Sequence, residues 1–90
     1  MKINFKSFPI YTDISHETRE SVDVKNSLAN TLYMNVPGIA AHVLAEKIYK
    51  AEGEMDLTLE EVGLIKSCHQ FFSGVFVDSF NDYVSANSGL

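Results

Sequence analysis

Hydrophobic residues recur at helical spacing over Leu57–Val84, and this stretch gives the clearest local prediction in the chain. Thr58 is followed three residues later by Glu61, which is the pattern of a capping box. In that motif each of the two side chains accepts a hydrogen bond from the backbone N–H of the other residue. Leu57 and Val62 can pack together across the same turn. The pattern therefore predicts a helix that begins at about residue 58.

The length of this stretch indicates that the helix is interrupted. A single straight helix would be about 40 Å long, whereas a globule of this chain length has a radius of gyration of only about 12 Å. Gly74 is the natural break, because glycine costs about 1 kcal/mol in a helix interior. We predict two helices at about 58–72 and 75–85, or one helix kinked at Gly74. In the alternative, the helix is unbroken and its aromatic second half forms an interface between chains, with Phe76, Phe80 and Tyr83 as the candidate contact residues.

The first residues of the chain alternate between apolar and polar side chains, which is typical of strands. The alternation over residues 2–14 shifts by one position near Phe8 and Pro9, and such a shift indicates a turn or a bulge. The pattern predicts either a hairpin of about 2–6 with 9–14 or one bent strand. A two-stranded hairpin is weak alone and needs helices against its apolar face.

The middle of the chain predicts two further helices, at about 23–35 and 39–51. Residues 15–21 are polar and are interpreted as a loop or a helix start, and residues 52–56 as a short link. Pro37 followed by Gly38 separates the two helices, because proline disfavours helical geometry in the residue before it. The side of the second helix that we expect to be buried comprises Ile39, Ala40, Val43, Leu44, Ala45 and Ile48.

These elements predict an α+β fold in one small domain over residues 1–90: an N-terminal β-hairpin or bent strand packed on three to four helices. The hydrophobic fraction of 46% and the charged fraction of 21% are ordinary for a globular chain and exclude a disordered one. Ninety residues bury only a modest core, so the stability is marginal or assisted by oligomerisation.

Charge and cysteine content limit the classes of partner. The net charge of −5 argues against nucleic acid as a partner, because phosphate contacts need lysine and arginine. The single cysteine, Cys68, cannot form a disulfide within the chain. No segment approaches the roughly 20 apolar residues of a membrane span, and no signal peptide is recognisable at the N-terminus. We therefore expect a cytoplasmic protein with no membrane or nucleic-acid partner.

Three groups of polar residues could carry chemistry, and each has a simpler interpretation. The acidic run from Glu52 to Glu61 fits a solvated loop and a helix start, since it lacks the ligand spacing of a calcium loop. Cys68 and His69 are adjacent, and neighbours on a helix do not face each other. A third cluster, which also fits a polar turn, comprises Asp13, Ser15, His16 and Glu17. The sequence predicts no catalytic residue, no metal ligand and no cofactor, and hence no enzyme.

One segment carries a resemblance. Gly38–Ser67 has an alanine-rich helix, a Gly-Glu link and a threonine-capped acidic helix start. In this it resembles helix–loop–helix segments of small uncharacterised proteins encoded by phages and integrated mobile elements of bacteria. The resemblance covers about a third of the chain and implies a bacterial, phage-related accessory role. None of the shared residues carries chemistry, so it assigns no functional residue.

The function expected from these patterns is that of a small, non-enzymatic protein-interaction or assembly module. It would self-associate, or bind a protein partner, through an apolar helix surface or a strand edge. One alternative is an acidic inhibitor that mimics nucleic acid on a partner protein, which requires the acids to cluster on one face. Another is a small ligand-binding domain or enzyme, which requires a pocket that joins His16 or His69 to a carboxylate.

Overall fold

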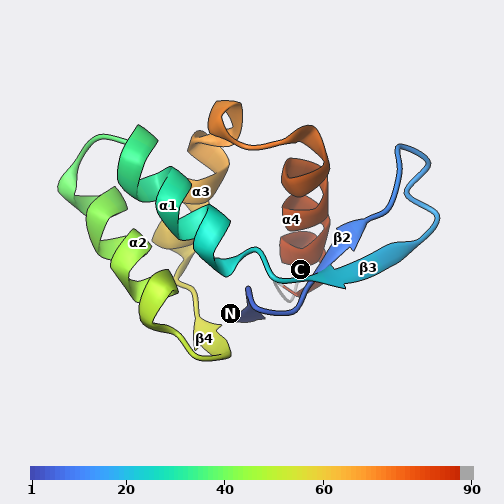
Figure 1. Cartoon of the computed structure of the whole chain (residues 1–90), viewed down its shortest axis with the longest axis horizontal. Coiled ribbons are helices and arrows are strands. Elements are labelled where there is room, and N and C mark those ends of the chain that lie inside the picture. The colour runs from blue at the N-terminus through green and yellow to red at the C-terminus, as the bar shows by residue number, and fades with distance from the viewer. Residues whose placement is uncertain (88–90) are drawn as a thin grey trace.

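The computed structural model of the chain describes residues 1–87, which form four α-helices and four short strands. The α+β class predicted from the sequence is confirmed. Helices α1 and α2 occupy one end of the long axis and the β2–β3 hairpin extends from the other (Figure 1). In chain order the elements are β1 (Lys2–Asn4), β2 (Phe8–Tyr11), β3 (Arg19–Val22), α1 (Lys25–Asn35), α2 (Ile39–Lys50), β4 (Glu54–Asp56), α3 (Leu59–Ser67), the 3-10 turn η1 (His69–Phe71) and α4 (Gly74–Asn87).

The two N-terminal strands pair with later segments and not with each other. Strand β1 is antiparallel to β4, with Ile3 opposite Met55, and β2 is antiparallel to β3. The predicted pairing of 2–6 with 9–14 is therefore wrong. Asn4 produces the turn between β1 and β2, because its side chain accepts from the Lys6 N–H at 2.9 Å and its carbonyl accepts from the Ser7 N–H at 3.4 Å.

The strands that pair with β1 and β2 come from two segments that were not predicted to be strands. Residues 15–21 were predicted as a loop or a helix start, but Arg19–Val22 is strand β3. Residues 52–56 were predicted as a link, and Glu54–Asp56 is strand β4. Only one residue of β4, Met55, is buried. A strand this short carries too little alternation to be recognised from its sequence.

The helices begin and end close to the predicted positions, with one exception. Gly38 separates α1 from α2 and has a φ of +103°, a backbone conformation that side chains rarely adopt. The predicted interruption of the last helical stretch is confirmed, but the first part ends at Ser67 and not near residue 72. Residues 68–73 form η1 and its flanks, and Ser73 then accepts from the Phe76 N–H at 3.3 Å at the start of α4.

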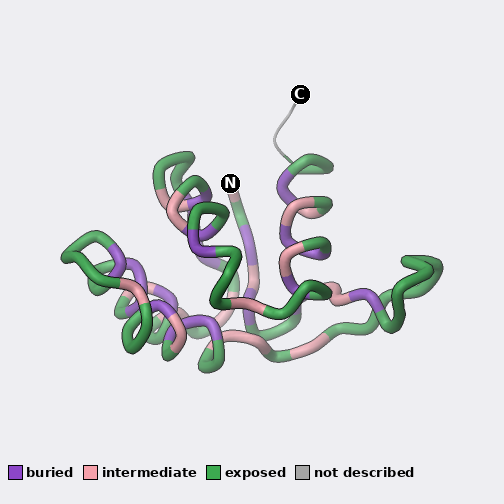
Figure 2. The backbone as a smooth tube through the Cα atoms, turned by 90° about the horizontal axis from the view of Figure 1, so that it is seen from above, coloured by how far each residue is buried: buried purple, intermediate pink, exposed green. Residues whose placement is uncertain are grey.

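The core joins the N-terminal strands to α4 through aromatic side chains. The Phe8 ring is fully buried, and its centroid lies 5.2–6.4 Å from those of Phe5, Phe76, Phe80 and Tyr83. These separations are in the favourable range for tilted aromatic pairs. In Figure 2 exposed backbone follows the outer turns of the helices and the β2–β3 loop. The loop and the α1–α2 end therefore supply most of the surface considered below.

Candidate functional site

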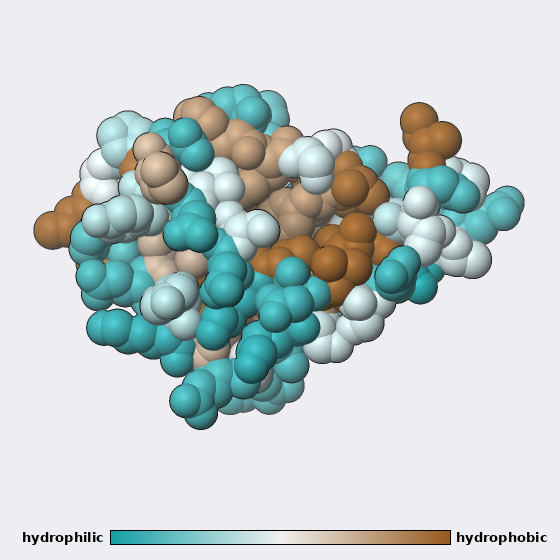
Figure 3. Space-filling view, in the orientation of Figure 1, coloured by the Kyte–Doolittle hydropathy of each residue, from teal (hydrophilic) through white to brown (hydrophobic). Residues whose placement is uncertain are grey.

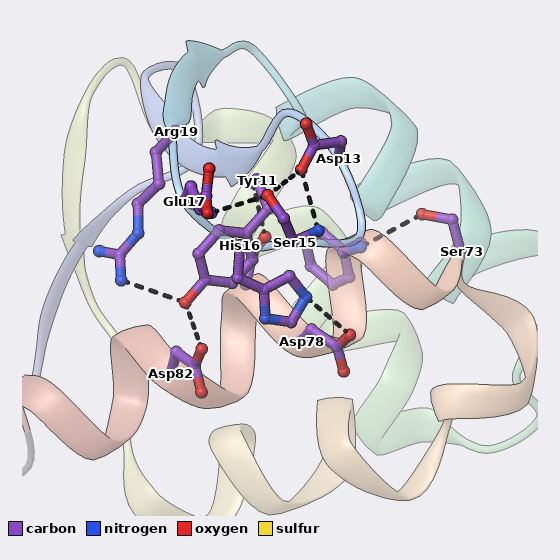
Figure 4. Close-up of polar contacts among 11 residues, drawn as sticks. Tyr11, Asp13, Ser15, His16, Glu17, Arg19, Ser73, Asp78 and Asp82 are labelled. Atoms are coloured by element: carbon purple, nitrogen blue, oxygen red, sulfur yellow. Dashed lines mark hydrogen bonds and ion pairs between the residues drawn. The ribbon is translucent and has the colours of Figure 1, made fainter.

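A network of polar side chains holds the β2–β3 hairpin against α4 (Figure 4). The Tyr11 hydroxyl donates to the Asp82 carboxylate and accepts from the Arg19 guanidinium at 3.1 Å. The Arg19 guanidinium carbon also lies 4.9 Å from the centroid of the Tyr11 ring. The Tyr11 backbone N–H donates to the Ser79 hydroxyl at 3.1 Å. Each of these contacts joins the hairpin to itself or to α4.

The loop between β2 and β3 is closed by its own side chains. The Asp13 carboxylate accepts from the Ser15 N–H at 2.9 Å and from the Ser15 hydroxyl, and these bonds hold the pKa of Asp13 below its usual value. His16 has a φ of +59°. Its ring stacks on Tyr11 with centroids 4.0 Å apart, and its Nε2 lies 3.3 Å from an Asp78 oxygen. The loop is thus held by hydrogen bonds between its own residues and by contacts of His16 with Tyr11 and Asp78.

This polar cluster positions the hairpin against α4. The sequence singled out Asp13, Ser15, His16 and Glu17 together, and the structure pairs His16 with Asp78 of α4 instead of an acid in the loop. No hollow described below includes a member of the cluster. Over residues 1–87 no group of three or more His, Cys, Asp or Glu side chains could hold a metal ion.

Cys68 and His69 differ in how far their side chains are buried. The Cys68 side chain is buried at the end of α3, whereas His69 is exposed in η1. His69 lines a hollow of about 390 Å³ between α3 and α4. The polar residues that line it with His69 are Lys66 and Asn81, and no carboxylate is among its lining residues. The hollow therefore does not provide the histidine–carboxylate pair that acid–base chemistry would use.

The acidic residues near α3 have structural partners. Glu61 accepts from the Thr58 N–H at 2.9 Å and from the Lys47 ammonium at 2.7 Å, so the predicted capping box is confirmed. Partial burial raises the pKa of Glu61, but the bonds from Lys47 and Thr58 outweigh it and the net pKa is lowered. The Lys2 ammonium lies 3.1 Å from an Asp56 oxygen and lowers the pKa of that carboxyl.

The aromatic residues predicted as an interface are part of the core. Phe76 is 8% exposed and Phe80 is 2% exposed within one chain. Tyr83 is half-buried, and its hydroxyl donates to the Lys2 carbonyl at 3.0 Å. Partial burial, followed by the nearby Glu54 charge, raises the pKa of Tyr83. Phe76 and Phe80 line the hollow between α3 and α4 but are largely buried within one chain, so we look for an interaction surface among the more exposed side chains.

Within residues 1–87, six of the nine exposed large apolar side chains lie on helices α1, α2 and α3. Ile39 and Val43, which the sequence placed on the buried side of α2, are instead exposed. The sequence predicted this side as buried because its apolar spacing is helical. Leu44, Ala45 and Ile48 are buried as predicted, but no element within residues 1–87 covers Ile39 and Val43. We call the set the helical apolar surface, and its members are Tyr33, Met34, Ile39, Val43, Tyr49 and Leu59.

A slot of about 210 Å³ lies between α1 and α2, and we call it the α1–α2 slot. Its floor is formed by two buried alanines, Ala29 and Ala45. Its walls are Tyr33 and Tyr49, each of which follows one of those alanines by four residues, so each pair lies on one helix face. The polar lining residues are Asn30, Glu46 and Lys50.

Two basic side chains stand beside this slot. The Lys50 ammonium lies 3.7 Å from a Glu46 oxygen, and Lys50 itself is largely exposed. The Lys25 ammonium donates to the Ala51 carbonyl at 3.0 Å and lies 5.7 Å from the centroid of the Tyr49 ring. The slot is therefore apolar inside and has two lysines and one glutamate, Glu46, at its edge.

A broader groove of about 610 Å³ lies between α2 and α3, and we call it the α2–α3 groove. Its apolar lining includes Ile39, Val43 and Leu64, and Gly63 leaves room between them. Its edge on the α3 side carries Glu60 and Glu61. The groove and the slot thus share apolar character but differ in the charge at their edges.

Comparison with protein-family models, with curated proteins and with solved structures finds no match to this chain. Within residues 1–87 no helix is both long enough and apolar enough to cross a membrane.

The sequence analysis missed Tyr33 and Tyr49 as a pair. The signal that could have found them is the repeated spacing, an alanine followed four residues later by a tyrosine, in two consecutive helices.

Proposed function

We propose that this protein is a non-enzymatic assembly module that self-associates through the helical apolar surface. The observation that supports the proposal is that six exposed large apolar side chains lie on three helices, and four of them line the slot or the groove. Exposed apolar surface of this kind marks interaction sites. Two of the six residues are tyrosines, a residue type that is enriched at protein interfaces.

Magnitudes indicate how much of this surface an interface must cover. Burying one large apolar side chain is worth about 1.5–3 kcal/mol, and association costs at least about 4 kcal/mol in lost freedom of motion. Two or more of these side chains must therefore be covered together. The result is a weak complex whose population rises with protein concentration, as in a dynamic assembly.

The two alternative functions lack a comparable observation. A nucleic-acid mimic would need its acids on one face, whereas Asp56, Glu61 and Asp82 lie on three different elements and each has a partner within the chain. An enzyme would need a pocket that joins a histidine to a carboxylate. The hollow beside His69 has no carboxylate in its lining, and His16 meets Asp78 on an exposed surface.

The proposal is tested by the solution mass of the wild type and of two double variants, measured by light scattering over a concentration series. The double variant Tyr33→Ala, Tyr49→Ala removes the walls of the α1–α2 slot. The double variant Ile39→Ala, Val43→Ala removes two large apolar side chains from the lining of the α2–α3 groove. Alanine is the best helix former, so the helices are retained. The matched control is Val75→Ala, an exposed apolar residue on α4 outside this surface.

We expect the wild type and Val75→Ala to associate equally and at least one double variant to associate more weakly. Either of two results would overturn the proposal. The first is a wild type that is monomeric at every concentration. The second is a pair of double variants that both associate as strongly as the wild type, which would place the interface elsewhere.

A further inference from the structure

We infer that the β2–β3 loop of one chain inserts Ile14 into the α1–α2 slot of a second chain. The inference rests on the proposed self-association and specifies which segment occupies which hollow. We call the Ile14 side chain the knob. It is 98% exposed and lies at the tip of the loop. Figure 3 shows hydrophobic atoms projecting at the hairpin end of the molecule, with mostly hydrophilic or neutral atoms around them.

The loop presents Ile14 in a fixed position. Asp13 and Ser15, on either side of it, are tied together by the two hydrogen bonds to the Asp13 carboxylate. The loop is closed behind them by Thr12, whose N–H donates to the Thr18 carbonyl at 3.1 Å. His16 is fixed by its stack on Tyr11. A pre-ordered knob loses little conformational freedom on binding, which favours association.

The α1–α2 slot matches this knob in size and chemistry. An apolar cavity of about 150 Å³ holds a benzene molecule of six carbons, and the slot measures about 210 Å³. The four carbons of the Ile14 side chain therefore fit with the alanine floor below them. The walls, Tyr33 and Tyr49, are exposed and would be covered by the same contact.

Charge favours the slot over the α2–α3 groove. The knob is flanked by Asp13 and Glu17, while the edge of the slot carries Lys25 and the Lys50–Glu46 ion pair, which leaves one positive charge in excess. At the edge of the α2–α3 groove Glu61 is paired with Lys47 and Glu60 leaves one negative charge in excess, so the same knob would meet a like charge there. Complementary charge selects a partner surface and speeds encounter.

The knob and the slot cannot meet within one chain. The hairpin lies at one end of a molecule 37 Å long, and α1 and α2 lie at the other (Figure 1). The contact joins unlike surfaces, so after the first contact the pair of chains keeps one free knob and one free slot. These two can bind each other in a symmetric dimer, in which each knob enters the slot of the partner, or bind further chains in open chains or closed rings.

The first experiment disables the two surfaces separately. Ile14→Glu places a charge on the exposed knob, and Tyr33→Ala with Tyr49→Ala removes the walls of the slot. Sedimentation equilibrium up to about 1 mM protein is used, because a small contact belongs to the weak class. We expect each variant to raise the dissociation constant at least tenfold, which corresponds to about 1.4 kcal/mol. The control, Ile39→Ala with Val43→Ala, is expected to match the wild type.

The second experiment mixes the two disabled variants in equal amounts. The Ile14→Glu chain keeps an intact slot, and the slot variant keeps an intact knob, so one good contact can form between them. We expect a 1:1 heterodimer that does not grow further, because the two surfaces left free in it are the altered knob and the altered slot. Circular dichroism and thermal unfolding of each variant alone verify that both are folded.

The outcomes separate this inference from the proposed function. If Ile14→Glu associates like the wild type, or if the mixture stays monomeric, the inference is overturned. Association that is lost only in the Ile39→Ala, Val43→Ala variant would also overturn it, but would support self-association through the helical apolar surface. A wild type that is monomeric throughout overturns both.

Discussion

Replacing Glu61 by alanine is expected to lower the free energy of unfolding by about 2 kcal/mol. The carboxylate joins α3 to α2, since it accepts from the Thr58 N–H at 2.9 Å and from the Lys47 ammonium at 2.7 Å. Loss of the capping contact costs about 1 kcal/mol. The ion pair adds up to about 1 kcal/mol, because Glu61 is 19% exposed while Lys47, at 36%, is partly screened by solvent.

The assay is thermal and urea unfolding of the wild type, Glu61→Ala and Glu61→Gln. For a domain of this size, 2 kcal/mol corresponds to a fall in Tm of about 8–16 °C. Glutamine keeps the acceptor oxygen and removes the charge, so Glu61→Gln should cost about half as much. Thr58→Ala, which removes the other half of the capping box, should cost about 1 kcal/mol.

The pH dependence gives an independent test of the same contacts. The pKa of Glu61 is lowered in the folded protein. The extra stability is therefore fully present above the unfolded pKa and is lost as the pH falls through the folded pKa. The difference between the wild type and Glu61→Gln should be largest near pH 7 and vanish in acid. A Tm that is unchanged in Glu61→Ala, or a difference that does not depend on pH, would refute the reasoning.

Three further substitutions test the fold that positions the interaction surfaces. Phe8→Ala removes a fully buried ring from the aromatic core and should cost about 3–5 kcal/mol in urea unfolding, and a loss below 1 kcal/mol would contradict the packing. Tyr11→Phe removes the hydrogen bonds to Asp82 and Arg19. It should lower the free energy of unfolding by about 1–2 kcal/mol and speed amide hydrogen exchange in β3. Unchanged exchange would mean that these bonds do not hold the hairpin. An added Cβ meets open space at both Gly63 and Gly38, but only Gly38 has a positive φ. Gly63→Ala should therefore raise stability by about 1 kcal/mol and Gly38→Ala should lower it, and a shift of the same sign in both would contradict this explanation.

Local signals in the sequence predicted the features that depend on neighbouring residues. The capping box of Thr58 and Glu61 was predicted because its partners lie three residues apart, and the break before α4 because Gly74 follows Ser73. The pairing of β1 with β4 joins Lys2 to Asp56, far along the chain. Such a pairing has no local pattern, and three residues of alternation cannot specify a distant partner.

The surfaces on which the proposals rest were harder to predict. Ile14 continues the alternation of the first strand region, and the sequence gave no reason to separate it from the strand. It is exposed because β2 ends at Tyr11 and the Asp13 side chain closes a turn onto Ser15. An aspartate two residues before a serine is a turn signal that could have marked the loop. The exposure of Val43 depends on which helix face is left uncovered, and periodicity alone does not determine this.

Self-association is the central claim, and sedimentation equilibrium of the wild-type protein over a wide concentration range tests it most directly. The monomer has a mass of 10.0 kDa. The account predicts a weight-average mass that rises above the mass of the monomer as the concentration increases, because the contact is weak and its population follows the protein concentration. A mass that stays at 10.0 kDa up to about 1 mM protein would contradict the account.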